Sequence, residues 1–202
     1  MLDRSEHYLT PDEERLLLRI ARDAVERWVL DGTQLELDAY PLTPTLREHH
    51  GAFVTLRLHG QLRGCIGHTT NREPLAISVR DNAINAATRD PRFPPLSAEE
   101  SPEVEIEVSA LTPGDAPDTP FKRVEDLDEI RIGRDGLYIE RLDQRGGLLL
   151  PQVATDHGWT VEQFLSAVCM KAGYPDGAWA EPTTRLYRFS AQVFGEPPKP
   201  IA

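Results

Sequence analysis

Residues 52–67 read AFVTLRLHGQLRGCIG, and this stretch decides the fold. Apolar and polar side chains alternate through its first seven residues, which is the pattern of a half-buried strand. His59-Gly60 then reverses the chain, and a return strand begins at Gln61. The stretch therefore predicts an antiparallel pair of strands, with Cys65 on or just beyond the end of the second strand.

Helices are predicted on either side of this pair. Thr10-Pro11-Asp12-Glu13 forms a capping box with proline at the first helical position, and the apolar stripe that follows stops at Asp31-Gly32. After the strand pair, Asn71 is expected to cap a helix of about 16 residues that ends near Arg89. Thr160 begins another capped helix later in the chain.

Further strands are expected where apolar residues alternate or run together, over residues 104–110, 130–132, 137–142, 148–153 and about 185–194. Asp135-Gly136 indicates a hairpin turn, and Arg145-Gly146-Gly147 indicates a second turn. Residues 33–50 and the proline-rich segment Asp90–Pro95 are expected to be irregular. Together these elements indicate an α+β fold, a mostly antiparallel sheet flanked by helices.

Length and charge limit the class of protein. The chain has 202 residues, with 22 Lys and Arg against 33 Asp and Glu, so its formal net charge is −11. This length suits a single domain with two lobes, and the Pro/Gly/Asp connector 112–120 is the candidate boundary between them. The proline-rich tail 196–202 is expected to fray.

The same composition indicates which partners to expect. An acidic chain is a poor binder of nucleic acid, because that affinity comes mostly from Lys and Arg at phosphates. Charged residues interrupt every apolar run before it reaches the length of a membrane span, and the N-terminus lacks a secretory signal. A cytoplasmic protein without a nucleic-acid or membrane partner is predicted.

Cys65 is the residue that most directly suggests chemistry. Gly64 beside it leaves the backbone open to a ligand, and Arg63 is expected on the same strand face, where its guanidinium favours the thiolate. A free cysteine with a pKa of about 8.5 is a few per cent thiolate at pH 7, and a decrease of roughly 1.5 makes about half of it thiolate. The alternative is that Cys65 packs as a small apolar residue, as is expected of Cys169 on its helix.

Other motifs give weaker signals. His68 follows Cys65 at C-x-x-H spacing, but no second Cys/His pair completes a zinc site, so no metal is predicted. Glu103, Glu105 and Glu107 line one strand face, either as acid/base or cation-binding groups or as a solvated surface. The chain has no G-x-S-x-G, P-loop or G-x-G-x-x-G motif, which argues against serine hydrolases, nucleoside triphosphatases and dinucleotide enzymes.

Several segments together resemble the AMMECR family, which in prokaryotes is called AmmeMemoRadiSam system protein A. The resemblance covers about residues 9–195 and rests on Gly51–Leu56, Leu62–Gly67, Asp90–Leu96, Glu107–Ser109 and Leu149–Ala154. It implies a larger and a smaller lobe around a cleft that the family's cysteine faces.

The resemblance also implies roles for individual residues. The positions that match the family's pattern are Arg63, Cys65, Arg92, Glu107, Gln152 and Lys171. From these we predict Cys65, Arg63 and Glu107 as catalytic residues, and Arg92, Gln152 and Lys171, together with Gly64 and Gly67, as substrate-binding residues. Three of these residues have a simpler alternative role. Arg92 could serve only to pin its loop, Gln152 only to satisfy backbone groups at a strand end, and Lys171 only to complement the dipole of a helix C-terminus. His68 departs from the family pattern and inherits no role.

Two functions follow from the resemblance and the residues. The first is a cysteine-dependent enzyme acting on a small molecule or a partner, in a pathway shared with Memo-like and radical SAM proteins, with which the family occurs. The alternative is a non-catalytic binding or adaptor module whose cleft holds a ligand or a partner segment. No motif in the chain identifies a substrate, a reaction or a cofactor.

Overall fold

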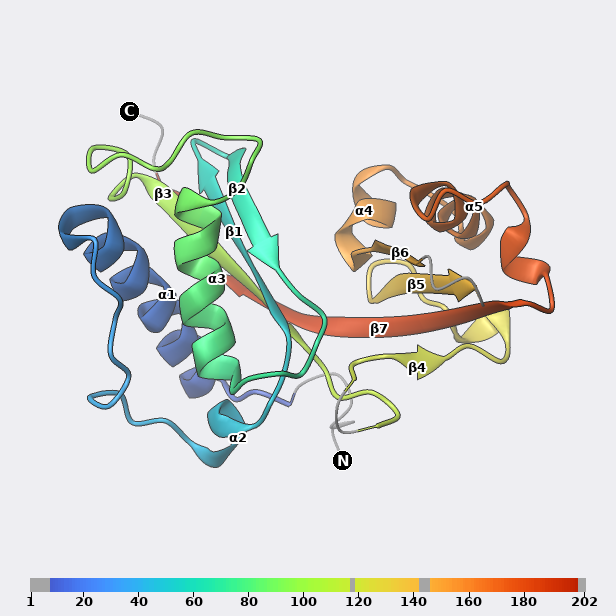
Figure 1. Ribbon diagram of the computed structural model, residues 1–202, viewed down its shortest axis with the longest axis horizontal. Helices are drawn as coiled ribbons and strands as arrows, with labels where there is room; N and C mark the ends of the chain where they lie inside the picture. Colours follow the sequence, from blue (N-terminus) through green and yellow to red (C-terminus); the bar gives the residue numbers. More distant parts are fainter. Residues whose placement is uncertain (1–7, 117–118, 142–145, 200–202) are drawn as a thin grey trace. The chain divides into compact units, whose positions relative to one another are not determined.

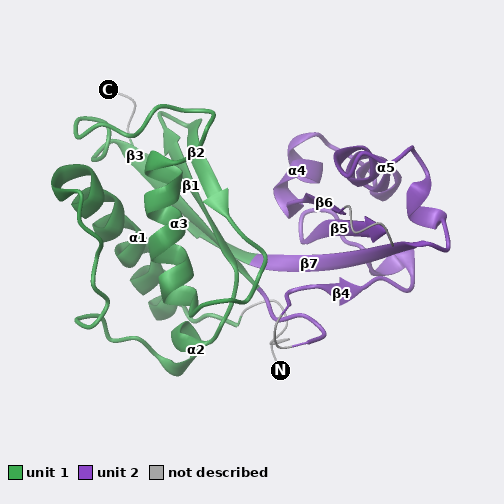
Figure 2. Cartoon of the chain, in the orientation of Figure 1, with its two compact units in different colours: residues 1–111, 192–202 green, residues 112–191 purple. Residues whose placement is uncertain are grey.

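The computed structural model describes residues 8–116, 119–141 and 146–199, which fall into two compact units (Figures 1 and 2). Unit 1 comprises Met1–Leu111 and Gln192–Ala202, and unit 2 comprises Thr112–Ala191. The strands pair antiparallel, and helices flank them in each unit. The predicted α+β class, with a mostly antiparallel sheet, is confirmed.

In unit 1, helices cover one face of a sheet whose strands follow the order β2-β1-β3-β7, where only the end of β7 belongs to this unit. Helices α1 and α3 pack their buried Leu17, Ile20 and Val79 into the same core as the inward side chains of β1 and β3. The bounds are α1 Pro11–Asp31, α2 Pro44–Arg47, β1 Ala52–Leu58, β2 Gln61–Gly67, α3 Leu75–Thr88, β3 Val104–Leu111 and β7 Thr184–Gly195.

Local signals account for most of these boundaries. Both hydrogen bonds of the Thr10–Glu13 capping box are present, and Gly32 ends α1 in the left-handed conformation at φ 65°. The prediction for Asn71 is wrong, because α3 begins after Pro74 and Asn71 Oδ1 instead accepts the backbone N–H of Gly51 at 3.2 Å. The arm 33–50 also contains a helix that was not predicted, the short α2, because the Thr43 hydroxyl caps it.

Unit 2 contains a second sheet, in which β7 pairs with β4 and β5, and β5 pairs with β6. Leu137 and Ile139 of β5 are fully buried against Phe164 and Leu165 of α5. The bounds are β4 Lys122–Arg123, β5 Asp135–Arg141, β6 Gly146–Leu149, α4 Pro151–Asp156 and α5 Val161–Lys171, with short 3-10 helices at Leu127–Glu129 and Ala178–Ala180. The Thr160 cap of α5 is confirmed.

Several predictions for unit 2 are wrong. Asp135-Gly136 is not a hairpin turn, because both residues belong to β5 and pair with β7. The strand expected over 148–153 ends at Leu149, and Pro151 begins α4, because proline suits the first turn of a helix, where no N–H partner is needed. Residues 130–132 form no strand: the chain turns there because the buried Asp135 carboxylate accepts the Arg131 N–H at 2.9 Å. In the second predicted turn, Gly146-Gly147 begins β6, and Arg145 lies outside the described residues.

The tail after β7 is held against unit 1 as far as it is described. Glu196 forms an ion pair with Arg22 of α1, and its N–H donates to the Ile106 carbonyl at 2.9 Å. The Lys199 N–H donates to Glu105 Oε1 at 2.8 Å. The expectation of fraying is therefore wrong for residues 196–199, while 200–202 lie outside the described residues. Among the helices of the described chain, none combines the length and apolarity needed to cross a membrane.

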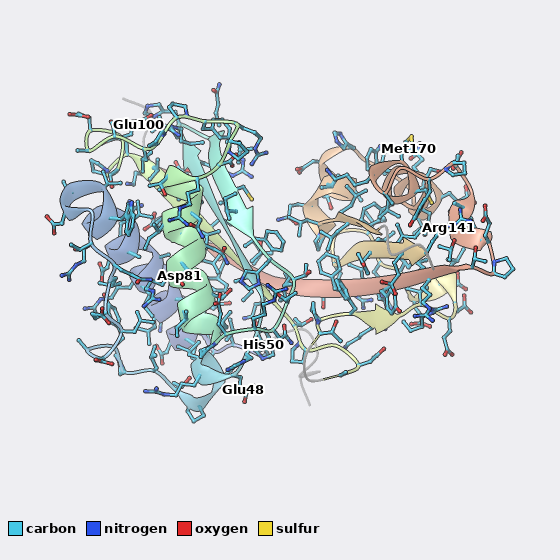
Figure 3. The ribbon with its side chains drawn as sticks, viewed as in Figure 1. Glu48, His50, Asp81, Glu100, Arg141 and Met170 are labelled. Atoms are coloured by element: carbon cyan, nitrogen blue, oxygen red, sulfur yellow. The ribbon has the colours of Figure 1, made fainter. Side chains whose placement is uncertain are left out.

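The rings of Tyr8 and His50 pack against each other in unit 1, with centroids 5.3 Å apart and planes tilted by 57°. Within the described chain, neither ring nitrogen of His50 has a hydrogen-bond partner, and neither has the Tyr8 hydroxyl. Glu48 Oε2 lies 3.5 Å from His50 Nε2, and both residues are labelled in Figure 3. Burial lowers the pKa of His50 below its ordinary value, and it outweighs the opposite influence of Glu48; His49 lowers the pKa further.

Acidification should therefore cost stability through His50. Because the folded-state pKa lies below the ordinary value of about 6.5, the unfolded chain takes up the proton first, and stability falls as the pH drops through that value. We expect His50→Phe, which cannot titrate, to reduce the pH dependence of the unfolding free energy between about pH 7.5 and 5.5. Urea denaturation at a series of pH values measures this, and identical slopes for both proteins would contradict it.

Candidate functional site

Cys65 lies inside β2, in a row of three residues that crosses the sheet of unit 1. It is opposite Thr55 of β1, and Thr55 is opposite Glu107 of β3. Successive side chains on a strand point to opposite faces, and the neighbouring Val54 and Leu56 point into the helix-covered core. The row Cys65–Thr55–Glu107 therefore lies on the sheet face opposite α1 and α3.

Thr55 is the residue that contacts the thiol. Its hydroxyl donates a hydrogen bond to Cys65 Sγ at 3.3 Å, while Thr55 itself is almost buried and Cys65 is half-buried. Cys169 differs, since it is fully buried in unit 2 and burial raises the pKa of its thiol. Its predicted packing role is confirmed. Only Cys65 combines partial exposure with a hydroxyl donor, which suits a reactive thiolate.

Asp90 and Arg92 hold the backbone of Cys65. The Cys65 N–H donates to Asp90 Oδ2 at 2.8 Å, and Arg92 Nη2 donates to the Cys65 carbonyl at 3.4 Å. β2 is an edge strand, so these backbone groups have no neighbouring strand to pair with. The loop that carries Asp90 and Arg92 provides their hydrogen-bond partners instead. Sequence reasoning missed Asp90. The only available signal was an acidic residue directly before the proline of the D-P-R run.

The Asp90 carboxylate is buried, and both of its oxygens accept hydrogen bonds. Besides the Cys65 N–H, it accepts the Arg92 backbone N–H at 3.1 Å, Nε at 2.9 Å and Nη2 at 2.7 Å. Arg92 thereby holds the pKa of Asp90 well below its usual range. The pKa of Arg92 is raised, mainly by its hydrogen bond to Asp90. Arg92 therefore pins its loop and also holds the backbone carbonyl of Cys65.

Arg63 does not form the expected contact with the thiol. A bulge interrupts the register between Leu56 and Arg57, leaving Arg63 without a partner in β1 and breaking the alternation on which the expectation depended. The guanidinium binds Glu100 with Nε at 2.9 Å and Nη2 at 2.8 Å, and Nη1 donates to the Pro94 carbonyl at 3.0 Å. Glu100 is labelled in Figure 3. Arg63 therefore anchors the loop that carries Asp90 and Arg92.

The two glycines of the motif pack closely against protein atoms. A Cβ at Gly64 would lie 2.2 Å from the Ala86 carbonyl oxygen of α3, and one at Gly67 would lie 2.4 Å from the Ala52 carbonyl oxygen and from the Phe53 ring. The space beside each glycine is thus filled from within unit 1. Their predicted contribution to substrate binding gains no support, and close packing of strand against helix or strand explains both.

The remaining candidates have their own surroundings. Glu107 is half-buried, and its carboxylate makes no hydrogen bond or ion pair with any residue that the structure describes. Gln152 lies in α4 rather than at a strand end, and its buried Oε1 has no partner among the described residues. Lys171 is exposed in the last turn of α5. Gln152 and Lys171 belong to unit 2, and their roles, like the cleft, stay predictions.

His68 has structural partners. Its Nδ1 lies 3.0 Å from the Thr70 carbonyl oxygen, and its Nε2 lies 3.0 Å from Glu73 Oε1. Across the described ranges, no three His, Cys, Asp or Glu side chains come together in an arrangement that could hold a metal ion.

Comparisons with known proteins agree with one another. The AMMECR1 family model matches residues 18–194. A protein of Methanothermobacter thermautotrophicus is 46% identical over 191 residues, which cover 93% of this chain and 96% of that protein. Protein MJ0810 of Methanocaldococcus jannaschii is 42% identical over 190 residues, covering 93% and 92%. The crystal structure of the uncharacterized protein PH0010 from Pyrococcus horikoshii is similar with a TM-score of 0.83 and 37% identity, over 94% of each chain.

Proposed function

Since this chain belongs to the AMMECR1 family, we propose that it is a cysteine-dependent enzyme whose nucleophile is the Cys65 thiolate. One observation carries the proposal: the half-buried thiol accepts a hydrogen bond from Thr55, while the backbone of the same residue is clamped by the Asp90–Arg92 pair. Hydrogen-bond donors favour the charged form of a thiol, which is the form that attacks electrophiles.

A nucleophile must be held in position and its negative charge must be stabilised, and the contacts of Cys65 can do both. Asp90 fixes the position of Cys65 along β2, so the sulfur approaches an electrophilic centre from a defined point. The Thr55 hydroxyl stabilises the negative charge on sulfur before attack, and Arg92 holds the Cys65 carbonyl in place. The substrate is a small molecule or a group on a partner. Following the family resemblance, we also propose Memo-like and radical SAM proteins as partners in the same pathway.

Alkylation by iodoacetamide at pH 7, followed by mass spectrometry, tests the proposal, with the buried Cys169 as an internal reference. We expect Cys65 to react at least about tenfold faster than Cys169. Because a hydrogen bond to a charged group contributes about 1.5–3 kcal/mol, Thr55→Val should slow Cys65 by about tenfold or more. In Cys65→Ser the fast labelling at position 65 should disappear, while the slow labelling of Cys169 should remain.

Circular dichroism of each variant shows whether the fold is retained, so that a slower reaction is not mistaken for unfolding. A Cys65 that reacts no faster than Cys169 in the folded protein would refute the enzyme proposal. The alternative, a binding or adaptor module in which Cys65 only packs, would then be favoured. Equal rates in the parent protein and Thr55→Val would remove the role of the hydroxyl.

A further inference from the structure

The positive charges of Arg63 and Arg92, the two arginines near Cys65, are already neutralised by carboxylates. Arg63 is paired with Glu100 at 2.8 Å, and Arg92 is paired with Asp90 at 2.7 Å. An anionic ligand at either guanidinium would have to compete with a carboxylate that already accepts its N–H groups. These pairs therefore do not make the surroundings of Cys65 selective for an anion.

Glu107 is in the opposite situation. Its half-buried carboxylate has no partner among the described residues, whereas the next acidic side chain on this face, Glu105, lies directly opposite Arg57. Glu105 also accepts the Lys199 N–H at 2.8 Å. Of the carboxylates along β3 on this face, Glu107 is thus the least compensated, and it is the one in the row with the thiol.

The spacing of the row suits a ligand that touches both ends. Neighbouring strands are about 4.8 Å apart, so Cys65 and Glu107, two strands apart, are roughly 10 Å apart at their Cα atoms. Thr55 lies between them. Gly195 lies next to Glu107, since a Cβ at Gly195 would be 3.6 Å from the Glu107 Cβ. Because glycine has no side chain, this neighbour does not cover the Glu107 side chain.

We infer that the substrate of the Cys65 site carries a protonated amino group, which Glu107 binds while the electrophilic centre meets the thiol. This inference rests on the proposed function and specifies its substrate class. A half-buried carboxylate without a cation loses hydration and gains nothing in return, so an ammonium group is the complementary ligand. Paired in this way, Glu107 acts as a counter-ion and specificity residue, which is the cation-binding alternative of the sequence analysis rather than the acid/base one.

Three methanethiosulfonate reagents provide the test: the cationic 2-ammonioethyl, the anionic 2-sulfonatoethyl and the uncharged methyl reagent, with each rate constant divided by that of the same reagent with the free thiol 2-mercaptoethanol. In each reaction the Cys65 thiolate attacks the reagent's divalent sulfur, a mixed disulfide forms and methanesulfinate leaves. Mass spectrometry gives the rate constant at Cys65. The variant is Glu107→Gln. Its matched control, Glu103→Gln, removes one negative charge just before the same strand, from a side chain that is exposed.

After this normalisation we expect the cationic reagent to react about three- to tenfold faster than the anionic one in the parent protein, as a single charge at this distance in a partly aqueous site would produce. Glu107→Gln should abolish most of that ratio, and Glu103→Gln should retain it. The same ratio in both variants, or a preference for the anionic reagent, would overturn the inference and leave the proposed function standing. Failure of the uncharged reagent to modify Cys65 in the folded protein would instead refute the proposed function itself.

Discussion

Gly64→Ala is expected to lower the unfolding free energy by about 3 kcal/mol, because the added methyl group meets backbone rather than a movable side chain. The new Cβ would lie 2.2 Å from the Ala86 carbonyl oxygen and 3.1 Å from the Ala86 carbonyl carbon. Relief requires α3 to move away from β2, which loosens the core that Val79 and Ala83 share with the sheet. Urea denaturation followed by circular dichroism measures the loss.

Gly195→Ala is the matched control, since it also adds one methyl group to a strand of unit 1. There the nearest atom is the Ile106 carbonyl oxygen at 3.3 Å, a contact that a small adjustment relieves. We expect a change within about 1 kcal/mol. If Gly64→Ala kept full stability but slowed the alkylation of Cys65, the predicted role of Gly64 in ligand approach would be favoured over packing.

Asp90→Asn is expected to cost about 2–3 kcal/mol at pH 7, the second large effect, because a buried carboxylate with four donors cannot be replaced by an amide that has only one acceptor atom. An amide leaves either the Cys65 N–H or part of the Arg92 guanidinium without its acceptor. Thermal and urea unfolding measure the loss. Asp12→Asn is the control, since Asp12 also pairs with an arginine, Arg15, but is highly exposed, and it should change stability little.

The pH dependence of the two proteins should differ in a defined direction. Arg92 depresses the pKa of Asp90 in the folded state, so the stability that this carboxylate contributes is fully present above its unfolded-state pKa of about 3.9. That contribution is lost as the pH falls below this value toward the folded-state pKa. Asp90→Asn should therefore flatten the acid limb of the stability profile. A variant that keeps the acid limb of the parent protein would contradict the assignment of these contacts to Asp90.

Local patterns were sufficient wherever the determining interactions lie within a few residues. The capping boxes at Thr10 and Thr160 close through side chains three residues apart, and both helices begin where they indicate. Alternation over residues 52–58 sets which side chains enter the core, so β1 was predicted correctly. The run around Pro151 was ambiguous, because a short apolar segment suits a strand end and a helix start equally well until its neighbours are known.

The sequence by itself determined the α+β class, the antiparallel β1–β2 pair, the family and the singling out of Cys65, because each depends on short-range pattern or on residue type. Only the tertiary structure decided what surrounds the thiol. Asp90 binds the Cys65 N–H although it is 25 residues away in the sequence, and Glu100 binds the Arg63 guanidinium although it is 37 residues away. The bulge beside Arg57 also undid the alternation on which the Arg63 expectation relied. Such contacts depend on where a loop returns in space, which no spacing along the chain specifies.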